Sequence, residues 1–326
     1  MRAIVTGGLG FIGSYLTELL LDKGHTVLVV DNCSSNVVGP DHFTDRCDVL
    51  TTSVGDLYEF LTWRADVVYH LASYVGPVGI LKHAGDMAPN IIRETTHLRD
   101  ICARYSMPLI FVSTSEIYGT GGTMAEDNQK LFEGYEVRTE YGASKMLAEI
   151  LVVNKARVKA GLNYHIVRPF NVVGPGQRHD GGFVLPRFVK AVIDREPMTV
   201  YGDGQQRRAF TDVRDVSRAI YDISASESAN EIWNVGNPEN EMTIEQLAYG
   251  VLDVGVNLGH EPIEHPIVYV DPKKIHGPLF SEVPDKIPDS TKLFDFGWKP
   301  EIPLDKTIED TFKYMQNGSR KTDKVL

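Results

Sequence analysis

The sequence predicts an α/β protein in which a Rossmann-type, doubly wound parallel sheet carries a smaller C-terminal α/β substrate lobe. Three observations support this fold class. Short apolar runs rich in β-branched residues alternate with helical stretches over the first half of the chain. The glycine-rich turn TGGLGFIG (6–13) separates the first apolar run from the first helical stretch. Beyond about residue 175, Gly and Pro become frequent and shorter elements interleave, which indicates a separate lobe.

The predicted elements follow one another in the order that a parallel sheet requires. Apolar runs bounded by turn residues predict buried strands at 2–6, 25–31, 66–72, 108–114 and 163–172. Helical periodicity predicts the intervening helices at 11–24, around 90–105 and at 141–160.

The domain boundaries are drawn from the same pattern. We expect a nucleotide-binding domain at 1–175 and a substrate-binding lobe at 176–318. Residues 210–235 contain an amphipathic stretch that we expect to fold back onto the first domain. The polar end of the chain, 319–326, is expected to be frayed.

The composition excludes several classes of protein. The 326 residues are 42% hydrophobic and 24% charged, as in an ordinary globular protein. The formal net charge of −11 argues against a non-specific nucleic-acid binder. Cys33, Cys47 and Cys102 lack metal-like spacing and fit a reduced, intracellular setting, and the ten histidines show no clustered ligand spacing. No export segment or membrane-length apolar run is present, so we expect a cytoplasmic protein with no metal and no membrane or nucleic-acid partner.

The glycine-rich turn predicts a dinucleotide site. Gly7 permits a tight turn, Gly10 lets the backbone approach a pyrophosphate, and Gly13 allows close packing of helix on strand. The predicted helix begins at Phe11. Its first residues, Phe11 and Ile12, would offer unpaired N–H groups and the positive end of the helix dipole to the phosphates.

The end of the second strand predicts which dinucleotide is bound. Asp31 would accept hydrogen bonds from the adenosine ribose and repel a 2′-phosphate, and no arginine follows it in DNCSSN, so we expect NAD rather than NADP. Asn32 and Ser35 in the same loop are further candidates. Asp56 and Leu57, on a later loop, would face the adenine edge, although Asp56 reads equally well as a turn or cap residue.

Two other motifs predict the reactive centre. STSEIYG (113–119) places hydroxyls and a carboxylate where a buried strand ends. Tyr141 and Lys145 lie four residues apart on one helix face, where an ammonium would favour the phenolate and lower the tyrosine pKa from about 10. Thr114 would bond the substrate hydroxyl that Tyr141 deprotonates. The expected chemistry is hydride transfer from an alcohol carbon to a nicotinamide, whereas a YxxxK spacing alone is also common as surface decoration.

Seven motifs, in this order, resemble the extended short-chain dehydrogenase/reductase superfamily and its sugar-nucleotide epimerases, dehydratases and decarboxylases. They are TGGLGFIG, HLAS, STSEIYG, YGASK, RPFNVVGPG, YGDGQQRRAFTDVRD and NVGNPEN, and the resemblance covers residues 1 to about 315. It implies tightly held NAD, a UDP-sugar substrate oxidised at carbon 4, and a homodimer built on the helices at 90–105 and 141–157. It also implies that Leu71, Ala72, Ser73 and Asn90 line the cofactor, while Tyr141 is the base and Lys145 holds it.

The triplet Thr114, Ser115 and Glu116 indicates which branch of the superfamily the chain resembles most. The dehydratases have a carboxylic acid where this chain has Ser115, and simple 4-epimerases have a small or hydroxyl residue where it has Glu116. The triplet resembles the UDP-glucuronate decarboxylases, including UDP-xylose synthase, UDP-apiose/xylose synthase and the aminoarabinose-pathway decarboxylase. Arg138 and Arg208 match arginines of those enzymes, in which Glu116 and Arg208 would assist decarboxylation or reprotonation.

The same resemblance implies a set of substrate-binding residues, namely Arg138, Asn171, Val184, Tyr201, Arg208 and Lys286. Residues 74–84 depart from the loop that those decarboxylases have near the substrate. Lys286 stands where many relatives have arginine, and lysine cannot make the same two-pronged contact. A UDP- or dTDP-sugar 4-epimerase, a 4,6- or 5,6-dehydratase, and a non-catalytic NAD-binding regulator remain as alternatives.

Overall fold

A computed structural model describes most of the chain. The described residues are 1–59, 64–119, 124–129, 134–158, 161–280, 283 and 285–317. The predicted frayed tail at 319–326 lies outside them.

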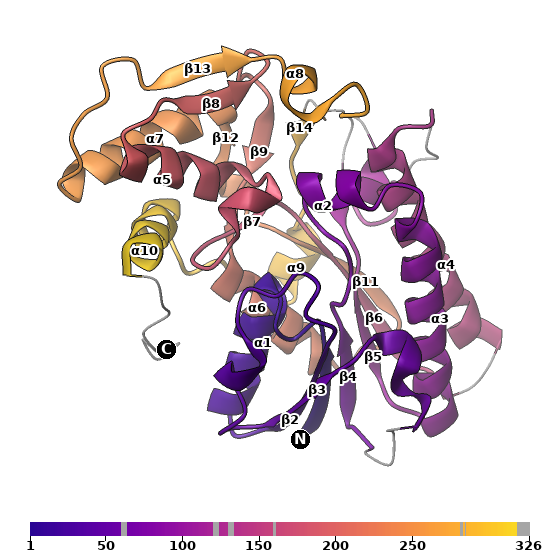
Figure 1. Cartoon of the computed structure of the whole chain (residues 1–326). Helices are drawn as coiled ribbons and strands as arrows, with labels where there is room; N and C mark the ends of the chain where they lie inside the picture. The colour runs from indigo at the N-terminus through magenta and orange to yellow at the C-terminus, as the bar shows by residue number, and fades with distance from the viewer. Residues whose placement is uncertain are drawn as a thin grey trace.

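A seven-stranded, wholly parallel sheet forms the centre of the molecule (Figure 1). Its strands are β1 (Arg2–Thr6), β2 (Thr26–Asp31), β3 (Asp48–Thr51), β4 (Val67–His70), β5 (Leu109–Val112), β6 (Tyr164–Pro169) and β11 (Glu231–Val235). They lie in the order β11-β6-β5-β4-β1-β2-β3, with each neighbouring pair parallel. The predicted Rossmann-type fold class is therefore confirmed, although β3 and the position of β11 were not predicted.

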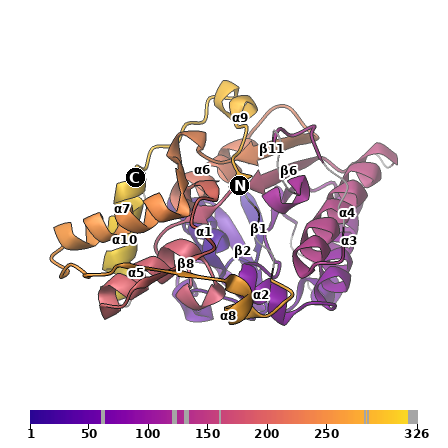
Figure 2. The ribbon, with the colours of Figure 1, turned by 90° about the horizontal axis from the view of Figure 1, so that it is seen from above.

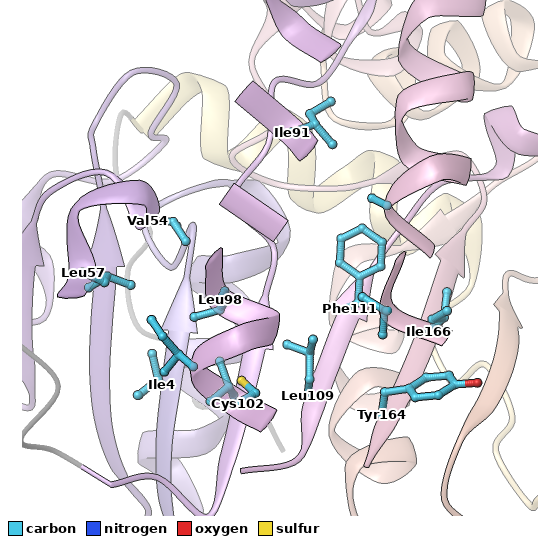
Figure 3. Close-up of a cluster of buried hydrophobic side chains, with 14 of the residues drawn as sticks. Ile4, Val54, Leu57, Ile91, Leu98, Cys102, Leu109, Phe111, Tyr164 and Ile166 are labelled. Carbon is cyan, nitrogen blue, oxygen red and sulfur yellow. The ribbon is translucent and has the colours of Figure 1, made fainter. Parts of the chain in front are cut away.

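Helices cover both faces of the sheet because successive strand residues point to opposite sides. On one face, Ile4 and Phe111 pack against α3 (Met87–Tyr105) and α4 (Val137–Val158), as Figure 3 shows in part. On the other, Val5 and Ile110 pack with α1 (Phe11–Asp22), α6 (Val213–Ser224) and α9 (Thr291–Asp295). Residues of α6 and β11 thus return to the central sheet after a long excursion.

The remaining C-terminal elements form a third apolar cluster, apart from those on the two faces of the sheet. Helices α5 (Val184–Asp194), α7 (Ile244–Asn257) and α10 (Leu304–Asn317) pack together there, on the opposite side of the molecule from α3 and α4 (Figure 2). The accompanying short strands are β7 (Val172–Val173), β8 (Met198–Tyr201), β9 (Arg207–Ala209), β10 (Thr211–Asp212), β12 (Glu241–Thr243), β13 (Ile267–Val270) and β14 (Asp285–Lys286). They make three small sheets, β10-β7, β12-β9-β14 and β13-β8. Among the described residues there are also two short α-helices, α2 (Pro77–Lys82), which follows β4, and α8 (Pro272–His276), which follows β13.

A buried ionic network ties the sheet to α4. The guanidinium of Arg168, on β6, is fully buried and donates to both carboxylate oxygens of Glu149 at 3.0 and 2.6 Å. It also donates to the Tyr118 hydroxyl at 2.8 Å, and that hydroxyl donates to Asn234 on β11 at 2.6 Å. Because a buried charge is stable only when it is paired, these contacts fix the relative positions of α4, β6, β11 and the turn that contains Tyr118.

Replacing Glu149 by leucine should strongly destabilise the fold. The Arg168 guanidinium would remain buried without its counter-charge, a loss of about 3–5 kcal/mol in the free energy of unfolding. Urea denaturation at neutral pH measures the change. The control is Glu261→Gln, because Glu261 forms an ion pair with Arg195 at 3.0 Å in which both side chains are more than two-thirds exposed, and its loss should cost less than about 1 kcal/mol. Equal losses for the two variants would contradict the structural role of the network.

Candidate active site

A cavity of about 630 Å³ opens at the carboxyl ends of the sheet strands, where ligands bind in open α/β sheets. Segments that follow β1, β2, β4 and β5 line one part of it, and C-terminal elements line the rest. Every site residue predicted from the sequence lines this cavity except Asp56 and Leu57. The structure therefore brings together residues from both halves of the chain.

The glycine turn leaves the cavity wall made of backbone. Gly7 has φ +72°, and a Cβ there would lie 2.7 Å from the backbone nitrogen of Ala72. A Cβ on Gly13 would lie 2.0 Å from the Gly7 carbonyl oxygen, so both positions require glycine. Gly10 is the N-cap of α1 and offers no capping side chain. Phe11 and Ile12 line the cavity at this helix end, an arrangement suited to the pyrophosphate of a dinucleotide.

Asp31 occupies the position expected for a ribose-binding carboxylate. It ends β2, is largely buried, and accepts hydrogen bonds from the backbone N–H groups of Leu9 at 3.0 Å and Cys33 at 2.8 Å. These two donors fix the carboxylate at the cavity wall while lone pairs remain for further donors. Asn32 and Ser35 line the wall beside it.

Asp56 and Leu57 lie outside the cavity lining. Leu57 is 2% exposed and packs into the core cluster that also contains Ile4, while Asp56 is exposed on a 3₁₀ helix. Thr52 and Val54 line the cavity in their place, directly after β3. Recognising the four-residue strand β3 would have drawn attention to the residues that follow it.

The predicted reactive groups converge where β5 ends. Thr114 caps the 3₁₀ turn Ser115–Tyr118, its hydroxyl accepting the N–H of Glu116 at 3.2 Å. Tyr141, on α4, is 5% exposed, and the hydroxyls of Thr114 and Ser73 lie close enough to act on its pKa, which they lower. This arrangement places a phenol and a hydroxyl side by side at the cavity wall.

Lys145 does not lower the pKa of Tyr141 in this structure, which corrects the expectation drawn from their spacing. Burial and the negative charge of Glu116 raise the pKa of Tyr141 and outweigh the hydroxyls of Thr114 and Ser73. The Lys145 ammonium instead donates to the carbonyl of Val112 at 3.0 Å. Burial lowers the pKa of Lys145 to about 8, against the charges of Glu149 and Glu94.

Two cations form ion pairs with Glu116, and a third, Arg208, acts on it through its charge. The Glu116 carboxylate is 2.5 Å from the Lys286 ammonium and 3.7 Å from the Arg138 guanidinium. Burial alone would raise the pKa of Glu116, but the charges of Lys286, Arg138 and Arg208 lower it to about 2. Glu116 is therefore ionised at neutral pH and cannot serve as a proton donor in this arrangement.

Three of the residues predicted to bind substrate, Asn171, Val184 and Tyr201, line the part of the cavity formed by elements that follow β6. Asn171 donates to the carbonyls of Ala209 and Lys286, both at 3.1 Å, and Val184 begins α5. The Tyr201 hydroxyl lies 2.8 Å from the His276 ring nitrogen.

Arg187 was not predicted to belong to this site. It lies over the Tyr201 ring at 4.3 Å and also lines the cavity. It follows Val184 by three residues on α5, so the helical period would have placed it on the same face.

Within the described ranges, no group of three or more His, Cys, Asp or Glu side chains is arranged to hold a metal ion. None of the helices in the described part of the chain combines the length and apolarity needed to cross a bilayer.

Comparison with known proteins places the chain among nucleotide-sugar enzymes. The model of the NAD dependent epimerase/dehydratase family matches residues 3–236. A UDP-N-acetyl-alpha-D-glucosaminuronate decarboxylase of Bacillus cytotoxicus is 31% identical over 324 residues, covering 97% of this chain and 98% of that protein. UDP-glucuronic acid decarboxylase 2 of Arabidopsis thaliana is 31% identical over 316 residues, covering 93% of this chain and 66% of that protein. A solved UDP-glucose 4-epimerase from Thermotoga maritima, with UDP-glucose, has a TM-score of 0.83 and 28% identity, covering 98% of this chain and 99% of its own.

The ionised state of Glu116 makes a prediction about acid stability. Its pKa is lowered from 4.5 to about 2 on folding, so its contribution to stability is present above pH 4.5 and is lost as the pH falls towards 2. Between pH 4.5 and about pH 3, wild type should lose unfolding free energy faster than Glu116→Gln, by up to about 1.4 kcal/mol per pH unit. Urea denaturation across this range measures both slopes, and parallel slopes would contradict the lowered pKa.

Proposed function

The chain belongs to the NAD-dependent epimerase/dehydratase family, and we propose that within this family it decarboxylates a UDP-linked hexuronate, with UDP-glucuronate as the first candidate. The family assignment confirms the resemblance seen in the sequence motifs and makes the protein an NAD-dependent enzyme rather than a non-catalytic regulator.

The observation that carries the proposal is the charge around Glu116. Lys286 and Arg138 form ion pairs with the Glu116 carboxylate, and Arg208 adds its charge from nearby, which leaves a net positive charge beside Thr114 and Tyr141. Lys286 and Arg208 are both buried, so solvent ions screen their attraction for an anionic group only weakly. A hexuronate brings a carboxylate to this region in addition to its diphosphate, whereas a neutral hexose brings only the diphosphate.

The cofactor residues fit NAD. The glycine turn and the open N-terminus of α1 suit the pyrophosphate, Asp31 suits the ribose hydroxyls, and Asn90 and Lys145 line the cavity towards the reactive centre. When bound, NAD supplies a hydride acceptor for carbon 4 and a positive charge that offsets the raised pKa of Tyr141.

The protein's own groups account for the remaining steps. Thr114 orients the carbon 4 hydroxyl, and Tyr141 takes its proton as the carbon becomes a ketone. The uronate is then a β-keto acid, so the bond from carbon 5 to the carboxylate breaks and its electron pair passes to the carbon 4 oxygen as an enolate. Arg208 stabilises that enolate, and a proton from water at carbon 5 completes the loss of carbon dioxide. Glu116 stays ionised and holds Arg138 and Lys286 in place.

Two alternatives have specific support. A 4-epimerase activity fits the complete set of Thr114, Tyr141 and Lys145 and the likeness to the Thermotoga enzyme. A 2-acetamido uronate is a second candidate substrate because the Bacillus relative is named for decarboxylating one. Dehydration is less well supported, since Ser115 stands where those enzymes have an acid.

Incubation of the purified protein with NAD and UDP-glucuronate tests the proposal. Mass spectrometry of the sugar nucleotide should show the loss of carbon dioxide, with two further hydrogens if the keto pentose is reduced. Glu116→Gln should still reduce NAD but release carbon dioxide more slowly, by about tenfold or more, because the cation cluster loses its organising charge. The exposed Glu239→Gln is the matched control.

Three outcomes would contradict this account of the reaction. An unchanged mass with a new chromatographic peak would establish epimerisation. Loss of water would establish dehydration. Decarboxylation by Glu116→Gln at the wild-type rate would show that Glu116 does not assist the loss of carbon dioxide.

We also propose a homodimer that buries the outer face of α4. Leu147 and Ile150 lie three residues apart on this helix and are each 46% exposed, which is unusual for neighbouring aliphatic side chains.

Sedimentation velocity should show a dimer for wild type and a monomer for the double variant Leu147→Lys, Ile150→Lys, because lysine ammoniums resist burial in an apolar interface. Val268→Lys is the control, since Val268 is 47% exposed on β13. A monomeric wild type, or a dimeric double variant, would overturn the proposed interface.

A further inference from the structure

A connected stretch of chain, here called the roof segment (residues 74–86), crosses one side of the active-site cavity. It includes α2, which lies at the upper end of the sheet between α4 and the C-terminal elements in Figure 1. Tyr74, Val75, Lys82 and His83 of this segment line the cavity. The roof segment contains residues 74–84, the stretch that departs from the loop of the decarboxylases that the chain otherwise resembles.

The first end of the roof segment is joined to the reactive centre. Ser73 lies close enough to the Tyr141 hydroxyl to lower its pKa, and the Ser73 hydroxyl donates to the carbonyl of Tyr74 at 3.3 Å. The segment therefore begins in contact with the residue expected to act as the base.

The second end is held by a carboxylate of the same helix. Glu140, the neighbour of Tyr141 on α4, accepts the backbone N–H of Gly85 at 2.7 Å and that of Ala88 at 3.1 Å. Ala88 lies in the first turn of α3, whose N-cap Asp86 makes no side-chain capping bond. Glu140 thus caps α3 from a different helix, where a negative charge also interacts favourably with the helix dipole.

Between its two ends, the roof segment packs against the far side of the cavity. The rings of Tyr74 and His83 stack with centroids 4.0 Å apart and planes at 22°, which closes the segment on itself. A Cβ on Gly76 would lie 2.7 Å from the Phe183 ring, so a side chain at this position would collide with that ring. Gly76 and Gly85 both have positive φ, at +81° and +87°, and they flank the helical part of the segment.

We propose that Glu140 is a positioning residue for the reaction: it locks the roof segment to the catalytic helix, so that the Tyr74–His83 stack forms a fixed wall for the sugar. The identity of that sugar rests on the proposed function, whereas the lock itself rests only on the contacts of Glu140. Because Glu140 and Tyr141 are adjacent, the wall and the base move as one body. Glu140 does not line the cavity itself, so it acts on the ligand only through the roof segment.

Glu140→Gln tests the proposal because glutamine keeps the shape of the side chain but offers a single acceptor oxygen and no charge. Hydrogen–deuterium exchange of the NAD-loaded protein should show about tenfold faster exchange at Gly85 and Ala88, and no change in the central strands. The KM for UDP-glucuronate should rise about tenfold, while NAD affinity stays within about twofold of wild type. The matched control is Glu136→Gln, an exposed glutamate one turn earlier, which should leave every value unchanged.

The outcomes separate this proposal from the proposed function. Unchanged exchange at Gly85 and Ala88 would overturn the lock. Faster exchange with an unchanged KM, or with a loss of NAD affinity instead, would overturn the positioning role. If wild type leaves UDP-glucuronate unaltered, the proposed function fails, and the exchange comparison, which needs no sugar, still decides whether Glu140 holds the roof segment.

Discussion

The buried pair of Arg168 and Glu149 is the interaction on which the geometry of the active site depends. Glu149 lies four residues after Lys145 on α4, and Arg168 also holds Tyr118 at the end of the turn that carries Ser115 and Glu116. The pair therefore fixes the helix that bears the phenol and the ammonium against the turn that bears the carboxylate. A site assembled on two rigid elements keeps its reacting groups at constant separation, which is a requirement for efficient proton and hydride transfer.

Electrostatics then divide this site into two unlike parts. Near the base, burial disfavours every charged form, so Tyr141 stays protonated and Lys145 has a pKa of about 8. Near Glu116, three cations outweigh the cost of burial and keep a carboxylate ionised. The part around Tyr141 and Lys145 is suited to bind a positively charged cofactor, and the part around Glu116 is suited to bind an anionic substrate. Under the proposed function, a uronate that is oxidised and then loses its carboxylate would use both parts.

Local sequence patterns predicted most of the sheet, because buried parallel strands are continuous apolar runs bounded by turn residues. They did not predict β3, whose four residues are only partly buried, or the return of β11 beside β6, which depends on contacts between distant parts of the chain. Motif resemblance selected Glu116, Arg138 and Lys286. It gave no indication that Glu116 and Lys286, separated by 170 residues, form an ion pair. The prediction that Lys145 lowers the pKa of Tyr141 was also wrong. Helix spacing places the two residues on one face, but the Lys145 ammonium points to the carbonyl of Val112, which belongs to a distant part of the chain.

The most direct test of the account is the fate of carbon 5 when the NAD-loaded protein acts on UDP-glucuronate in deuterium oxide. The proposed reaction passes through an enolate that takes its proton from solvent, so the pentose product should carry one deuterium at carbon 5, as seen by NMR. A sugar recovered with its carboxylate intact and with hydrogen retained at carbon 5 would contradict the account and leave oxidation and return of hydride at carbon 4 as the chemistry of this site.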